Sequence, residues 1–304
     1  HGLASTAWAF ATLGIPAPQL FDAIARESEQ RIGSINEQNL ANTAWAFAIA
    51  GTADRGALVE AVSARAAEMG LAAFSSDGRC QLHQFFLCIE LEACQPFELL
   101  EACQPVELLA PIGLRDACRQ AMADSKPAHS SRLHEDVSSE LTRMGIVHAN
   151  ELCVPRLGYH VDIAISPIVT TGMPGTAAVG DVSDQPLDEV AARAREAVRA
   201  AIADYAGIVI EVDGPTHYDD ERRLRPASGM IRRHLALAGW VVLAVPYWEW
   251  NALKGQARKE YLAELLARAA SSTPGSRAVW RLADSVSPSR LLKQQSSESK
   301  QQRT

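Results

Sequence analysis

The most constraining stretch of the chain is residues 207–218, GIVIEVDGPTHY, in which an apolar run passes into an alternating Glu-Val-Asp and ends at Gly-Pro. This pattern predicts a buried β-strand that ends at an open edge of a sheet. Because side chains alternate along a strand, Glu211 and Asp213 point to the same side, about 7 Å apart. Two carboxylates on a mostly apolar strand need solvent or a shared cation. A strand end that has simply reached solvent is the simpler alternative.

The residues after this strand predict a strand–helix–strand unit. A helix over residues 230–238 ends at Gly239, where glycine suits a C-terminal cap. Residues 240–246, WVVLAVP, form a continuous apolar run, as in a central strand of a parallel sheet. The pattern therefore favours parallel pairing of the two strands through a right-handed crossover, followed by a last helix at about residues 258–268.

Five motifs of this region, IEVDGPTHY, RRHL, GWVV, VPYWEWN and YL, follow one another within about 60 residues. In this order they resemble the RAP domain, the C-terminal module of FAST-kinase-like organellar RNA factors. The resemblance implies an RNA-binding factor in organellar RNA processing, stability or translation. It also implies a single-stranded RNA partner, an organellar transcript or rRNA, and a location in the mitochondrion or chloroplast. The chain begins inside a helical pattern, so we expect a fragment whose targeting segment lies outside it.

Residues 2–14 and 39–51 are two copies of one pattern, GLASTAWAFATLG and NLANTAWAFAIAG, at an offset of 37 residues. This period predicts stacked helical hairpins, with Asn36 as a helix cap. The shared LAxTAWAF resembles octotricopeptide-type repeats, which implies a solenoid that lies along single-stranded RNA. Trp8 and Trp45 are expected in equivalent, largely buried positions between helices. Stacking on RNA bases is the alternative for these two rings.

Before the 207–218 strand, the pattern predicts a helix ending at Gly145, a short strand at 151–154 and an alternating strand at 159–165 that carries Asp162. This element order resembles the restriction-endonuclease-like core. The expected fold is therefore α + α/β. Its parts are helical hairpin repeats forming a solenoid over residues 1–125, a restriction-endonuclease-like α/β RAP domain over 131–285 with a core at 206–266 and a surface insertion at about 166–206, and a disordered tail at 286–304.

The nuclease resemblance implies a set of metal ligands. A helix Glu, a strand Asp and a second strand's Glu hold a divalent ion in such enzymes, which by position gives Glu140, Asp162 and Glu211 here. Oxygen ligands of this kind suit Mg2+. Asp213 stands where the relatives keep a catalytic Lys, and this anion opposes formation of an attacking hydroxide. His217 is a candidate acid or base near neutral pH, or a cap of the loop after the strand.

The candidate catalytic residues of a Mg2+-dependent endoribonuclease are therefore Asp162, Glu211, Asp213 and His217. Such an enzyme is the alternative to RNA binding without cleavage. Candidate RNA contacts are the arginines that follow the strand. They are Arg222, Arg223, Arg232 and Arg233.

Charge is distributed unevenly along the chain. Of 36 acidic and 29 basic residues, 15 and 8 lie within residues 1–130, which leaves 21 of each kind after them. Because phosphate contacts supply much of the affinity for nucleic acid, an acidic helical half argues against tight RNA binding by this fragment alone. A protein-interaction scaffold that docks a partner on the acidic half is the third alternative.

The six cysteines form no Cys-x-x-Cys pair and have no matching His spacing, which argues against zinc. Reduced, mostly buried thiols are expected. No stretch reaches 18 uncharged apolar residues, so no membrane span is expected.

Overall fold

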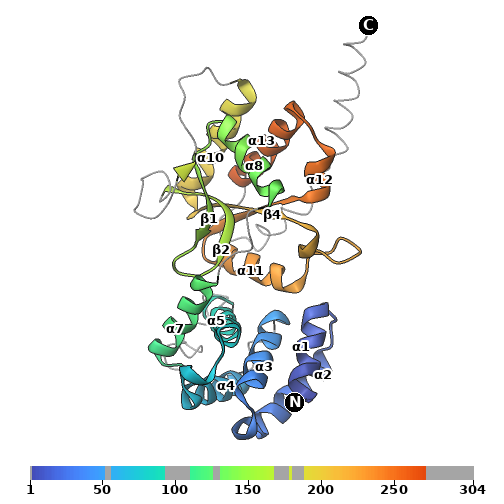
Figure 1. Ribbon diagram of the computed structural model, residues 1–304, viewed down its shortest axis with the longest axis vertical. Helices are drawn as coiled ribbons and strands as arrows, with labels where there is room; N and C mark the ends of the chain where they lie inside the picture. Colours follow the sequence, from blue (N-terminus) through green and yellow to red (C-terminus); the bar gives the residue numbers. More distant parts are fainter. Residues whose placement is uncertain are drawn as a thin grey trace. The chain divides into compact units, whose positions relative to one another are not determined.

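The computed structural model of this chain describes residues 2–51, 56–92, 110–125, 131–167, 178–179 and 188–271. The chain divides into two compact units, and Figure 1 labels most of their helices and strands. Unit 1 comprises His1–Lys126, Pro155–Tyr159 and Asp219–His234, and unit 2 comprises Pro127–Val154, His160–Tyr218 and Leu235–Thr304. Unit 1 thus includes two short segments that lie beyond residue 125, the boundary expected from the sequence.

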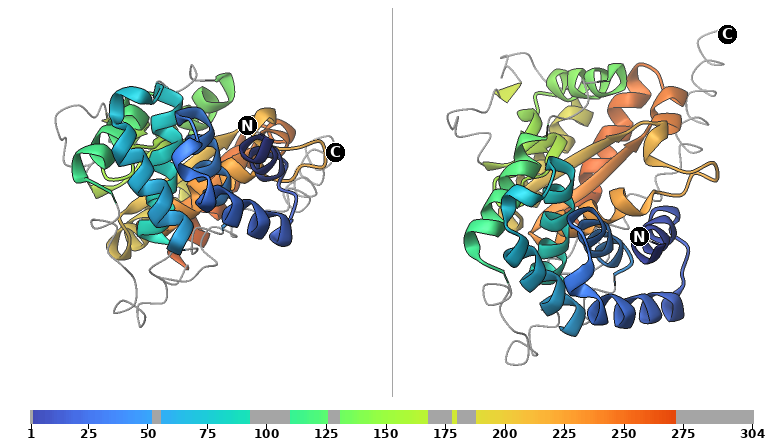
Figure 2. Two further views of the ribbon diagram at one scale, coloured as in Figure 1. Left: turned by 90° about the horizontal axis from the view of Figure 1, so that it is seen from below. Right: turned by 60° about the horizontal axis from the view of Figure 1, so that its bottom comes forward.

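Unit 1 is helical. Its elements are α1 (Gly2–Leu13), α2 (Pro18–Gln30), η1 (Ile32–Ser34), α3 (Glu37–Ile49), α4 (Gly56–Met69), η2 (Leu71–Ala73), α5 (Ser76–Leu91), α7 (Ile112–Asp124) and the part of α11 (Pro226–Leu237) that ends at His234. Helices α1, α3, α5 and α7 pack side by side in this order. Helix α2 contacts α1, α4 contacts α3, and α2 and α4 contact each other. Figure 2 shows this succession from blue to green.

Local sequence signals begin and end these helices. The side chain of Asn36 caps α3 by accepting a hydrogen bond from the backbone N–H of Asn39 at 2.9 Å, as the sequence predicts. Gly14 and Gly51 follow α1 and α3 with φ of +65° and +66°, a conformation that glycine adopts without strain. Between the helices, Phe21 and Phe47 meet edge to face with ring centroids 5.2 Å apart in the buried core.

Unit 2 is built on a five-stranded sheet in the order β3-β1-β2-β4-β5. The strands are β1 (His148–Cys153), β2 (His160–Ile165), β3 (Ala178–Val179), β4 (Gly207–Asp213) and β5 (Trp240–Pro246). β4 and β5 pair in parallel, and the other neighbours pair antiparallel. The helices are α8 (Arg132–Arg143), α10 (Glu189–Asp204), α12 (Tyr247–Ala252) and α13 (Gln256–Ala270), with the short η4 (Pro215–His217) after β4.

The α + α/β fold class predicted from the sequence is confirmed. So are the parallel pairing of residues 207–213 with 240–246 and the adjacency of β2 and β4, in which Ile163 pairs with Ile210. Every residue of β5 is buried, as its unbroken apolar sequence predicts.

The interpretation of residues 166–206 as a surface insertion is wrong in two respects. β3 extends the sheet by pairing with β1, and α10 packs against α13 in the core. Ala191, Ala194, Val198 and Ala201 form the buried stripe of α10, which Asp188 caps. The alanines make this stripe weakly apolar in sequence, but their small size allows close helix packing. Residues 168–177, 180–187 and the predicted tail at 286–304 lie outside the described residues.

Candidate functional site

The carboxylate of Asp162 lies where β2 meets the end of β4. The paired register of these strands ends at Ile163 and Ile210, and one further step would set Asp162 opposite Glu211. Here Oδ2 of Asp162 accepts a hydrogen bond from the backbone N–H of Val212 at 2.7 Å. Burial raises the pKa of Asp162, and the Val212 N–H opposes that rise by stabilising the ionised form. The Asp162 carboxylate therefore binds the backbone of β4 between Glu211 and Asp213.

Two further side chains join Asp162 in a cluster. His134 of α8 and Glu151 of β1 each offer a ligand atom, and these atoms and that of Asp162 lie within 4.8 Å of one another. Nδ1 of His134 is 3.3 Å from Oε1 of Glu151, and Nε2 is 3.1 Å from Oδ1 of Asn150. His134 is 3% exposed, so α8 presents this imidazole to the sheet and not to solvent.

The backbone at Glu151 is unusual. Its φ is +53°, a left-handed conformation that a non-glycine residue adopts only when its surroundings stabilise it. The β1–β2 register runs through Asn150–Ile163 and Leu152–Val161 but omits the intervening pair of Glu151 with Asp162. Burial raises the pKa of Glu151 as well. The strained position and the two raised carboxyl pKa values mark this cluster, hereafter the β-edge cluster (His134, Glu151, Asp162), as a candidate functional site.

Glu140, predicted as the helix ligand, is not part of the β-edge cluster. It lies six residues after His134, which is about 240° further around the helix, and it forms an ion pair with Arg143. The prediction of Glu140 is therefore corrected, since the helix contributes an imidazole from its first turn instead. Glu211, also predicted as a ligand, is half-buried on β4 and is likewise outside this set of three.

Asp213 is held by the loop that follows β4. It is 1% exposed, and its Oδ2 accepts a hydrogen bond from the hydroxyl of Tyr218 at 2.7 Å. Nδ1 of His217 lies 3.5 Å from Oδ1 of Asp213. Tyr218 in turn packs edge to face on Trp248, with centroids 4.6 Å apart. Asp213 thus anchors the turn through its partners, and His217, whose side chain is 39% exposed, stands beside it at the surface.

The predicted RNA-contacting arginines occupy different environments. Arg222 and Arg223 are exposed, and Arg223 pairs with Asp219 at 2.7 Å and with Glu221 at 3.0 Å. Arg233 binds Glu92 through its guanidinium at 3.1 Å. Arg232 is 4% exposed, so a direct phosphate contact by this side chain is not available and its prediction is corrected. On α11, Arg232 lies about 60° around the helix from buried Leu235, three residues further along, and shares its packed side.

Residues 210–265 match the family model of the RAP domain. The chain contains a RAP domain. The match runs from the Glu-x-Asp of β4 through α11 and β5 into α13. The RAP domain is generally an RNA-binding domain, which supports an RNA-related role. Among the described residues, none of the helices combines the length and the apolar character needed to cross a bilayer.

A second candidate surface precedes the RAP domain in sequence, on the helices of unit 1. Trp8 of α1 and Trp45 of α3 stack with ring centroids 6.1 Å apart and planes inclined by 30°. Nε1–H of Trp45 donates to Oε1 of Gln84 on α5 at 2.8 Å. Beside them, the side chain of Gln81 donates to Oδ1 of Asn42 at 3.1 Å. We call this row across the adjacent helices α1, α3 and α5 the aromatic–amide column (Trp8, Trp45, Gln84, Asn42, Gln81).

The expected burial of both tryptophans is wrong for Trp8, which is 41% exposed, while Trp45 is half-buried. The buried residues of α1 are Ala4, Ala7 and Ala11, a small-residue stripe that packs closely. Trp8 lies about 100° from Ala7 around the helix, so its ring covers the flank of the interface. The two rings do pack together, and the exposed part of the Trp8 indole is accessible to another aromatic group.

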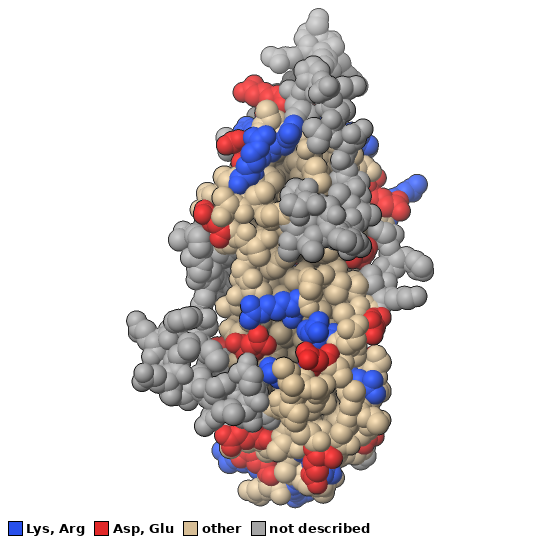
Figure 3. Space-filling view, turned by 90° about the vertical axis from the view of Figure 1, so that its left-hand side faces the viewer, with Lys and Arg blue, Asp and Glu red and all other residues tan. Residues whose placement is uncertain are grey.

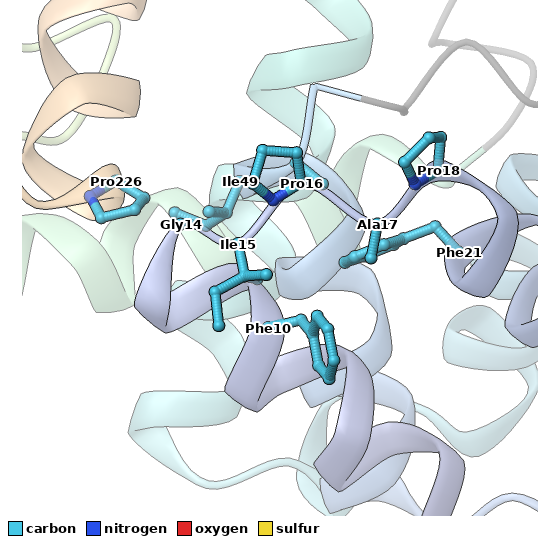
Figure 4. A pocket seen from close by; sticks show the side chains of 11 residues that line it. Phe10, Gly14, Ile15, Pro16, Ala17, Pro18, Phe21, Ile49 and Pro226 are labelled. Carbon is cyan, nitrogen blue, oxygen red and sulfur yellow. The ribbon is translucent and has the colours of Figure 1, made fainter.

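Unit 1 also has an apolar pocket of about 410 Å³ next to the turn between α1 and α2. Figure 4 shows Phe10, Ile15 and Phe21 with three prolines around it. None of its lining residues is charged, so it offers no phosphate contact from a side chain. We assign it no part in RNA binding.

Proposed function

We propose that this RAP-domain protein binds single-stranded RNA through its aromatic–amide column and acts in RNA processing, stability or translation. The observation that carries the proposal is the Trp8–Trp45 stack, open at Trp8 and continued by side-chain amides on the next helix. Aromatic rings stack on any base, and amides pair with base edges. The RAP domain adds independent support for an RNA ligand.

The charge of the molecule shapes how such binding would work. The net charge is −7, and on the face shown in Figure 3 basic and acidic side chains are interspersed. Few phosphates can then be neutralised, so stacking and hydrogen bonding supply most of the affinity. We expect a shallow dependence of affinity on salt, because the salt slope counts the neutralised phosphates.

We further propose that the protein works in the mitochondrion or chloroplast on an organellar transcript or rRNA. The support is the resemblance of the RAP motifs and of the LAxTAWAF pattern to organellar RNA factors. Imaging of the fluorescently tagged full-length gene product tests the location. A purely nucleocytoplasmic signal would contradict it.

The binding proposal is tested by fluorescence anisotropy with labelled oligouridine and with a random single-stranded RNA pool. We expect Trp8→Ala to weaken binding by about 1–3 kcal/mol, roughly 5- to 150-fold in Kd, through loss of base stacking. The matched control is Leu13→Ala, which removes a 69% exposed apolar residue from the same helix, about 140° around from Trp8. Equal affinities of wild type and Trp8→Ala would refute the role of the column.

A metal-dependent endoribonuclease is the second candidate, and the β-edge cluster favours it. Its fit to Mg2+ is incomplete, because one of the three ligands is an imidazole and Mg2+ prefers oxygen. Asp213 also stands at the position where the restriction-endonuclease-like nucleases that this chain resembles keep a catalytic Lys. These residues suit a cation that accepts nitrogen, such as Mn2+, better than they suit a nuclease centre. We therefore favour RNA binding without turnover.

Incubation of labelled RNA with the protein in Mg2+ and then in Mn2+ separates the two functions. Intact RNA with either metal is the expected result. Cleavage that disappears in His134→Gln and in Glu211→Ala would establish the nuclease. A wild-type protein that binds no RNA even at low salt would favour the protein-interaction scaffold, whose partner docks on the acidic helical half.

A further inference from the structure

A second group of metal-ligating side chains lies in unit 1, apart from the β-edge cluster. Cys88 and Glu92 stand one helical turn apart at the end of α5, and His234 comes from α11. Sγ of Cys88 and Oε1 of Glu92 are each 3.1 Å from Nε2 of His234, and they are 3.5 Å from each other. Three different donor atoms, sulfur, oxygen and nitrogen, thus face one point.

We propose that Cys88, Glu92 and His234 bind a Zn2+ ion that fastens α11 of the RAP domain to α5. Zinc takes cysteine sulfur, histidine nitrogen and carboxylate oxygen in tetrahedral geometry. With zinc–ligand bonds of about 2.3 Å to sulfur and about 2.05 Å to nitrogen or oxygen, the ligand atoms lie about 3.6 Å and about 3.3 Å apart. The observed separations differ from these by a few tenths of an ångström, so small side-chain shifts suffice.

The surroundings support the imidazole as a ligand through Nε2. The hydroxyl of Tyr159 lies 2.7 Å from Nδ1 of His234, and the two rings stack at 5.9 Å. A metal-bound imidazole characteristically places its other ring nitrogen against a hydrogen-bond partner that fixes its orientation. Tyr159 and His234 are both buried, so this orientation is set by packing before any ion arrives.

The charges define how an ion would enter. Glu92 is held by Arg233 and its side chain is 24% exposed, which gives the site one edge toward solvent. Zinc binding replaces the proton of the Cys88 thiol, which passes to solvent, while the carboxylate and neutral imidazole bind without losing a proton. The resulting Zn2+, thiolate and carboxylate sum to zero charge, and the positive charge of the Arg233 guanidinium, which is 26% exposed, remains at the solvent edge. The fourth position is left for water.

Zinc motifs are recognised in a sequence by ligands that lie near one another in the chain. His234 is separated from Cys88 by 146 positions and from Glu92 by 142, so no motif spacing can show the group. The three side chains are also diverse, whereas most sequence patterns for zinc rest on paired cysteines.

The site reaches toward the aromatic–amide column. The side chain of Gln84, which accepts from Trp45, also hydrogen-bonds Tyr159, the partner of His234. A metal on Nε2 would fix the remaining imidazole proton on Nδ1, directed at the Tyr159 oxygen. Zinc binding would therefore change the hydrogen bonding of Tyr159 and, through Gln84, that of the Trp45 indole.

The test uses the full chain, freed of metal by a chelator and titrated with Co2+ as a spectroscopic substitute for Zn2+. We expect one equivalent of Co2+ to give tetrahedral d–d bands with a thiolate charge-transfer band, and Zn2+ to displace it. Cys88→Ser should abolish the thiolate band and weaken Zn2+ binding by more than about 100-fold. The control Cys118→Ser, which alters another buried thiol of unit 1, should retain both.

Glu92→Gln keeps the volume of a partly exposed side chain and one hydrogen-bond acceptor, so it tests the site even if Cys88→Ser fails to fold. We expect it to weaken Zn2+ binding at least tenfold. Asp162→Asn in the β-edge cluster should leave the thiolate band unchanged. Co2+ binding without a thiolate band in the wild type, a band that persists in Cys88→Ser, or unchanged Zn2+ affinity in Glu92→Gln would each overturn the proposal.

Discussion

The carboxylate of Asp162 accepts a hydrogen bond from the backbone N–H of Val212 at 2.7 Å and so connects β2 to the C-terminal end of β4. This contact has two consequences that a mutation can separate. The acidic charge bears on metal and RNA, whereas the hydrogen bond bears on the stability of the sheet. An asparagine in place of the aspartate removes the first and preserves an acceptor for the second.

We predict that Asp162→Asn leaves RNA affinity unchanged or slightly raised, because it removes a negative charge without removing a phosphate contact. Asp162→Ala should lower the free energy of unfolding by about 1–3 kcal/mol, since it leaves the Val212 N–H without its acceptor. Urea unfolding and RNA anisotropy on both variants provide the comparison. A large loss of RNA affinity in a stable Asp162→Asn protein would show that the carboxylate takes part in RNA binding.

Gly207, at the start of β4, has no room for a side chain. A Cβ on this residue would lie 2.6 Å from the carbonyl oxygen of Ile165 and 2.7 Å from the ring of Trp240, and its φ is +155°. We predict that Gly207→Ala lowers the free energy of unfolding by about 2–4 kcal/mol, because backbone atoms must move. Gly33→Ala is the control, since its added Cβ meets nothing within 4 Å. Equal thermal unfolding of the two variants would contradict this account.

His83 should make stability depend on pH. Burial lowers its pKa to about 4 from 6.5, and it lies against the carbonyl oxygen of Leu157 at 2.6 Å. As pH falls, His83 is protonated in the unfolded chain before it is protonated in the folded chain. Its contribution to the free energy of unfolding is therefore complete above pH 6.5 and is lost as pH falls toward 4. The loss amounts to about 3 kcal/mol.

The variant His83→Gln keeps a donor for the Leu157 carbonyl but does not titrate. Its free energy of unfolding, measured by urea denaturation at intervals between pH 7 and pH 4, should fall less steeply than that of the wild type. Parallel slopes for the two proteins would assign the pH dependence to other groups.

The effect of replacing an arginine of the RAP domain should depend on whether its side chain is buried. We predict that Arg223→Ala weakens RNA binding modestly and flattens its salt dependence, because it removes an exposed charge. Arg232→Ala should instead lower the melting temperature, since this side chain is buried. Melting curves and salt titrations of RNA binding distinguish the two effects. An Arg232→Ala protein of normal stability with lost RNA affinity would restore the sequence-based assignment.

Several features were determined by the sequence alone. The apolar runs at 207–213 and 240–246 define two strands, Asn36 defines a helix start, and the RAP motifs lie in consecutive elements. These features depend on local periodicity and on backbone hydrogen bonding between near neighbours, which a single sequence records.

Only the tertiary structure decided which distant side chains meet. It replaced Glu140 by His134 at the β-edge cluster, buried Arg232, exposed Trp8, and brought His234 to Cys88. Residue type and period indicate whether a position faces a helix interface, but they leave open which of several acids, imidazoles or rings on neighbouring turns points into a given contact. That choice is made by the packing of elements that are far apart in the chain. On a helix, neighbouring residues point about 100° apart, so a shift of one position separates a metal ligand from a surface charge.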